Sequence, residues 1–106
     1  MFFGKPVIAT GWSGNMEYMH TGISFPIGCK LIPVKEGEYP AFENQVWAEP
    51  SLHEAVDALR RIIDDPALSK SIGERAKFHM QQNFSDRVLG KRYLKRLCEI
   101  PALNIK

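Results

Sequence analysis

The sequence has little cysteine and histidine, and neither is grouped as a metal site requires. The 106 residues hold two cysteines, Cys29 and Cys98, and three histidines. There is no Cys-x-x-Cys pair, and these residues fit no zinc-ligand spacing. We therefore expect no metal site and two free thiols, as is usual in a reducing compartment.

Long apolar segments and a large charge of one sign are also missing. No apolar run approaches the ~20 residues that span a bilayer, and the N-terminus lacks the apolar core of a signal peptide. The net charge of +2 is too small to indicate a nucleic-acid partner. With 44% hydrophobic and 25% charged residues, the composition is that of an ordinary globular domain. We expect one cytoplasmic domain over residues 1–106.

Residues 1–50 carry short apolar runs broken by glycine, proline and asparagine. The uninterrupted run Val7–Thr10 is typical of a strand buried on both faces of a parallel sheet. Pro26 and Pro33 weaken two further strands, because proline cannot donate a hydrogen bond to a sheet. The predicted strands are Val7–Thr10, Ile23–Ile27, Cys29–Val34 and Val46–Ala48, with a surface loop over Lys35–Gln45.

Residues 51–100 show helical periodicity instead. Ser51 and Glu54 have the spacing of a capping box, in which each side chain bonds a backbone N–H of the other residue. Pro66 begins a second helix that extends to about Gln82, and Ser85 is a plausible cap for a third, which Pro101 ends. The fold class is therefore α/β, with short parallel strands followed by three C-terminal helices. One apolar face of the first helix is predicted to comprise Leu52, Ala55, Val56, Leu59, Ile62 and Ile63.

The turn Gly11–Glu17 is the most informative local feature. It follows a predicted buried strand and begins a short helix, and ligands of open α/β sheets lie beyond the carboxyl ends of strands. Glycines at 11 and 14 allow close approach of a ligand, while Ser13 and Asn15 can cap the helix or leave its N–H groups free for a diphosphate. Glu17 can accept hydrogen bonds from sugar hydroxyls or complement the helix N-terminus. Spacing alone favours a purely structural turn with Asn15 as its cap.

Other candidate residues have plainer interpretations. Trp12 can stack on a sugar ring, although a packed tryptophan is the more common case. The three histidines have no acid or nucleophile at catalytic spacing, so we expect them to be structural or solvated. A basic last helix can contact a membrane surface, but a solvated face or contact with another domain is favoured. Its basic residues are Arg87, Lys91, Arg92, Lys95 and Arg96.

Three separated blocks of the sequence resemble the retaining glycosyltransferases of family 4, also called group 1. The run Gly4–Glu17 is similar to the family block G-x-P-V-[IV]-A-[ST], which is followed by a glycine pair and an acidic residue. Gly14 matches the second glycine, and Ser13 replaces the first. Gly37–Pro40 and Val46–Pro50 resemble a subgroup linked to bacterial surface polysaccharide. The helix ending at Asp65-Pro66 and the turn Asn83–Ser85 follow in the family's order.

The resemblance implies a GT-B fold, in which two Rossmann-like domains enclose the active site and the C-terminal domain holds a nucleotide-sugar donor. This chain would be the rear half of that domain, a single partial domain with a strand region (1–50) and a helical region (51–100). The family usually needs no metal, so no cofactor is expected. Membrane contact of the full-length protein would be peripheral. The implied donor-binding residues are Gly11, Ser13, Gly14, Asn15 and Glu17.

The same resemblance implies that the catalytic groups are missing. The family's paired glutamates, eight positions apart, precede the block that begins here, and Met1 aligns with the methionine just after them. We assign no catalytic residue and expect the isolated chain to be inactive, with weak or no donor binding. The alternative is a non-catalytic interaction module that self-associates through an exposed sheet edge.

Overall fold

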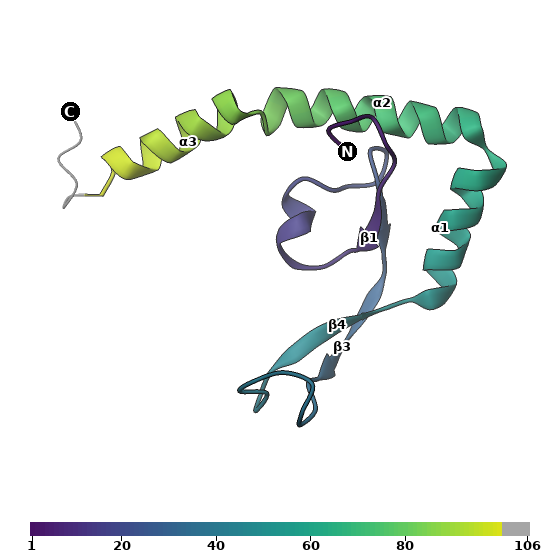
Figure 1. Cartoon of the computed structure of the whole chain (residues 1–106), viewed down its shortest axis with the longest axis vertical. Coiled ribbons are helices and arrows are strands. Elements are labelled where there is room, and N and C mark those ends of the chain that lie inside the picture. The colour runs from purple at the N-terminus through teal and green to yellow at the C-terminus, as the bar shows by residue number, and fades with distance from the viewer. Residues whose placement is uncertain (101–106) are drawn as a thin grey trace.

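A computed structural model describes residues 1–100 of the chain. It is a mixed α/β structure with short strands in the first half and helices in the second, as the sequence predicts (Figure 1). The prediction that Pro101 ends the last helix falls outside the described residues. The elements are β1 (Ile8–Thr10), the 3-10 helix η1 (Ser13–Glu17), β2 (Phe25–Ile27), β3 (Cys29–Pro33), β4 (Val46–Pro50), α1 (Leu52–Asp64), α2 (Pro66–Asn83) and α3 (Asp86–Cys98).

The strands form two separate pairs rather than one parallel sheet. β1 and β2 are parallel, with Ile8 opposite Phe25, whereas β3 and β4 form an antiparallel hairpin. The expectation of parallel strands is thus correct for the first pair and wrong for the second, because the 12 residues between β3 and β4 form no crossover helix and the chain returns directly beside itself. Phe25 and Ile27 make the backbone hydrogen bonds that join β2 to β1. Pro26 lies between them, and its backbone nitrogen points to the opposite edge of β2, so the N–H that proline lacks is not needed for this pairing.

The core forms where β2 meets α1 and α2. Phe25 and Ile27 of β2 pack with Ala58 of α1 and Ile72 of α2, and all four are buried. Each fully buried large apolar side chain contributes about 1.5–3 kcal/mol, so these contacts hold the strand and helix layers together. Partly buried residues packed around them are Ile8, Ala55, Ile62 and Leu68.

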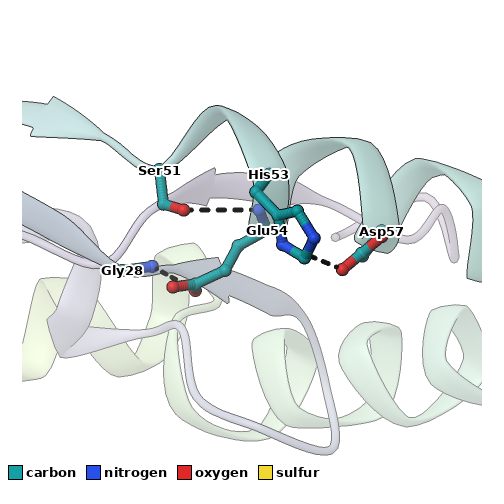
Figure 2. Close-up of polar contacts among 5 residues, drawn as sticks. All are labelled: Gly28, Ser51, His53, Glu54 and Asp57. Atoms are coloured by element: carbon teal, nitrogen blue, oxygen red, sulfur yellow. Dashed lines mark hydrogen bonds and ion pairs between the residues drawn. The ribbon is translucent and has the colours of Figure 1, made fainter.

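The N-terminus of α1 is fixed to the end of β2, as Figure 2 shows. The Glu54 N–H donates to Ser51 Oγ at 3.3 Å, which confirms Ser51 as the cap. The second half of the predicted capping box is wrong, because Glu54 Oε2 accepts the Gly28 N–H at 2.8 Å. The Ser51 N–H donates to the Gly28 carbonyl instead, also at 2.8 Å. The cap thus joins α1 to a residue 26 positions earlier rather than closing on itself.

The predicted apolar face of α1 divides into two faces. Ala55 and Ile62 pack toward the core with Ala58, as expected for that part of the face. Leu52, Leu59 and Ile63 do not, because they are exposed. At 3.6 residues per turn these two sets lie about 90° apart around the helix, and β2 and α2 cover only one of them.

The molecule is flat and open for its length. Its extents are 54 × 43 × 17 Å and its radius of gyration is 18.2 Å, whereas a compact domain of this length has a radius of about 13 Å. Figure 1 shows why: α1 and α2 border the β1–β2 pair, while the β3–β4 hairpin and α3 extend away from it. The accessible surface of 8219 Å² exceeds by about 2,200 Å² the value typical of a compact 12.1 kDa monomer. Several large apolar side chains, among them Phe3, Leu52 and Ile63, are left exposed.

We predict that Gly73→Ala destabilises the protein. Gly73 is buried in α2, and a Cβ at this position would overlap the carbonyl oxygen of Gly4. We expect the free energy of unfolding to fall by about 1–3 kcal/mol in urea titrations, because backbone must move to relieve the overlap. Gly90→Ala in α3 is the matched control, since its Cβ meets nothing within 4 Å. That substitution should raise stability by up to about 1 kcal/mol, and equal effects of the two would contradict this packing.

Candidate functional site

The turn Gly11–Glu17 lies directly beyond the carboxyl end of β1, as the sequence predicts for a ligand-facing position. The chain passes through η1 and a short connection before β2 returns parallel to β1. Ser13, Gly14 and Glu17 are exposed, while Gly11 and Asn15 are half-buried. The five predicted donor-binding residues are therefore brought into one short segment, and three of them face solvent.

The two glycines of this turn have different surroundings. The Gly11 N–H donates to the Ile27 carbonyl at 2.7 Å, and a Cβ on Gly11 would lie 3.1 Å from that oxygen. The close approach of the backbone to β2 therefore explains a glycine at position 11 without any ligand. A Cβ on Gly14 would meet nothing within 4 Å, so Gly14 leaves open space beside the turn. Contact of either residue with a donor stays a prediction.

Asn15 supports the turn, although not as the predicted helix cap. The N-cap of η1 is Trp12, and no side chain caps it. Asn15 Nδ2 instead donates to the Thr10 carbonyl at 2.8 Å, which ties the helix back to the end of β1. Ser13 adopts a positive φ of 66°, in the left-handed region that glycine favours. The turn is thus bent sharply at Ser13 and fixed at Asn15.

The charge and the aromatic group of the turn are both at its surface. Glu17 is the last residue of η1, so it does not complement the N-terminus of that helix, and that alternative interpretation is wrong. Trp12 is 46% exposed rather than packed. Both side chains remain accessible to a ligand. The turn itself contains no basic residue to balance an anion.

A separate groove lies between β2 and the two helices that cover it. Its volume is about 340 Å³, and Phe25, Ala58 and Ile72 are among its apolar lining residues. Arg61 and Arg75 also line it, and the Arg61 guanidinium lies 5.4 Å from the centre of the Phe25 ring. The groove shares no lining residue with the turn. No local signal in the sequence indicates that Arg61 folds over Phe25.

An aromatic cluster connects the segment after η1 to the junction of α2 and α3. Tyr18 packs edge-on against Phe84 with ring centres 6.0 Å apart, and His20 packs edge-on against His79 at 5.2 Å. The Arg92 guanidinium lies 5.4 Å from the centre of the Phe84 ring. His20 and His79 thus take part in aromatic packing, which agrees with the structural role expected for them. His53 is an exposed residue of α1, 3.2 Å from Asp57.

Among residues 1–100, no three histidine, cysteine or acidic side chains are grouped so that they could hold a metal ion. Cys29 and Cys98 are both free thiols. No helix of the described part of the chain has the length and apolar character needed to cross a membrane.

Comparisons with protein-family models, with curated proteins and with solved structures found no match to this chain. The residues quoted above are therefore the whole basis of the glycosyltransferase resemblance.

We predict that Ser13→Gly stabilises the protein by about 0.5–1 kcal/mol, because glycine adopts a positive φ without the steric cost that serine meets. Ser71→Gly is the matched control, since Ser71 is an exposed residue inside α2. That change should instead cost about 0.5–1 kcal/mol. Urea unfolding of both variants measures the difference, and destabilisation by Ser13→Gly would show that this turn is not bent as described.

Proposed function

We propose that the chain is the C-terminal, donor-binding portion of a nucleotide-sugar-dependent retaining glycosyltransferase. The observation that carries the proposal is the position of the turn. Ser13, Gly14 and Glu17 are exposed beyond the carboxyl end of β1, in a parallel pair whose two strands are joined through that turn. Open α/β sheets bind their ligands at such positions. A Rossmann-like GT-B domain working in the cytoplasm is the wider setting that this proposal assumes.

The conformation of Ser13 supports the proposal independently. The family block carries a glycine at this position, and here serine adopts the left-handed conformation that glycine favours, with a φ of 66°. The same backbone bend at this position would account for both residues, because glycine adopts it readily and Ser13 adopts it here. Gly14 follows with open space around it, which leaves room for a ligand to approach the backbone.

The groups needed for catalysis are not among these residues. No two glutamates of the sequence are eight positions apart, and the turn contains no basic side chain to stabilise a departing diphosphate. Electrostatic stabilisation of that leaving group is usually the largest catalytic contribution. The chain is therefore a binding portion without activity of its own, and its affinity for the donor alone is weak.

We predict that nucleoside diphosphates change the fluorescence of Trp12 with saturation at millimolar concentrations. The measurement uses a Trp47→Phe background so that only Trp12 emits. Gly14→Leu should abolish the response, because its side chain fills the open space beside the turn. Gly90→Leu is the matched control, since it adds the same side chain at another open position and should leave the response unchanged. If Trp12 does not respond at millimolar ligand, the turn is not a donor site by itself.

We further predict that the chain neither transfers nor hydrolyses sugar from common nucleotide-sugars. The physical reason is the missing stabilisation of the diphosphate leaving group. Release of nucleoside diphosphate is measured beside an intact retaining glycosyltransferase as positive control. Measurable turnover by this chain would contradict the proposed division between binding and catalytic parts.

The alternative function is a non-catalytic module that self-associates through the free edge of β1, a proposal that the geometry supports less well. Val7 and Gly11 bond to β2, so Ile8 and Thr10 direct their backbone groups to the free edge. The Thr10 carbonyl already accepts bonds from the Trp12 N–H and Asn15 Nδ2, both at 2.8 Å. Pro6 has no N–H to offer. The free edge therefore presents few groups for strand pairing.

A further inference from the structure

One side of α1, about a quarter turn around the helix from its core-facing residues, carries an uncovered apolar stripe, which we call the outer stripe and define as Leu52, Val56, Leu59 and Ile63. Leu52 is 78% exposed, Leu59 51% and Ile63 71%, and Val56 is half-buried. None of the four belongs to the core cluster or to the residues packed against it. The stripe is therefore accessible to a partner.

The spacing of the outer stripe indicates a helical partner. Its residues follow one another at intervals of four, three and four, which is the pattern of the seam between two paired helices. The pattern is identical in both directions along the helix. In an antiparallel pair related by a two-fold axis, both copies present the same surface, and this spacing places each residue of the stripe opposite a stripe residue of the other copy. We propose that the outer stripe binds the outer stripe of a second copy of this chain, with the two α1 helices antiparallel.

The proposed pairing places apolar groups opposite one another. With the two-fold axis midway between Asp57 and Ala58, Leu52 lies opposite Ile63 of the second copy, and Val56 lies opposite Leu59 of the second copy. All four positions of each stripe are then matched by an apolar residue. No charged side chain belongs to the seam itself, so burial leaves no charge unpaired within it.

The charges beside the stripe are complementary in the same arrangement. His53, Arg60, Asp57 and Asp64 share one flank of the stripe, where Asp57 also lines the groove beside β2 and lies 3.2 Å from His53 of its own chain. At 1.5 Å rise per residue, Arg60 comes within about 3 Å along the axis of Asp57 of the second copy. The symmetry repeats this pair, so two opposite-charge contacts border the seam.

The chain exposes about 2,200 Å² more surface than a compact monomer of its mass, and three residues of the outer stripe are among its exposed large apolar side chains. The interface is separate from the β1 edge and from the donor turn. Failure of this proposal therefore leaves the proposed donor binding unaffected, and the reverse also holds.

Sedimentation of the full chain over a range of concentrations tests the proposal. We expect a reversible monomer–dimer equilibrium in the wild type. Leu59→Glu should weaken the dimer at least about 100-fold, because two symmetry-related leucines lose their burial. Leu94→Glu is the matched control, since Leu94 is a leucine of α3 exposed to 55%, close to the 51% of Leu59. This control should leave the dissociation constant unchanged.

A charge exchange tests the antiparallel register without altering the apolar stripe. Arg60→Glu should weaken the dimer about tenfold, and combining it with Asp57→Lys should restore the wild-type dissociation constant. Circular dichroism of each variant verifies that α1 is still folded, so that dissociation is not mistaken for unfolding. A wild-type chain that stays monomeric at all concentrations would overturn the proposal. Equal effects of Leu59→Glu and Leu94→Glu would also overturn it.

Discussion

The packing of β2 against α1 and α2 is the contact on which the remaining arrangement depends. Phe25 and Ile27 of the strand pair pack against Ala58 of α1 and Ile72 of α2. The Gly28–Glu54 hydrogen bond then fixes where α1 begins relative to the end of β2. Because β1 is held parallel to β2, the same contact also sets the position of the turn beyond β1.

The rest of the molecule is held more loosely, and its proposed functions follow from that openness. The turn Gly11–Glu17 is bent at Ser13 and fixed by Asn15, yet its outer surface faces solvent. The β3–β4 hairpin and α3 extend from the core, and the outer stripe of α1 is uncovered. A chain with this much exposed apolar surface is expected to be completed by contact with other surfaces.

Sequence patterns predicted the order and type of the elements well, because these depend on local properties. Ser51 and Pro66 mark the beginnings of α1 and α2 through hydrogen bonding and backbone restriction that act within a few residues. The position of the candidate turn could also be predicted from neighbouring residues, because its glycines directly follow an apolar strand. The role of each turn residue could not be predicted in the same way. Asn15 donates a hydrogen bond to the Thr10 carbonyl and does not cap η1.

The sequence by itself therefore determined the mixed α/β class, the three helices and the location of the candidate turn. Only the tertiary structure decided that β3 pairs antiparallel with β4, that Glu54 bonds Gly28, and that Leu52, Leu59 and Ile63 stay exposed. Periodicity shows that a face is apolar, but it cannot show whether another element covers that face. Covering depends on contacts between residues far apart in the chain, and these contacts exist only once the chain is folded.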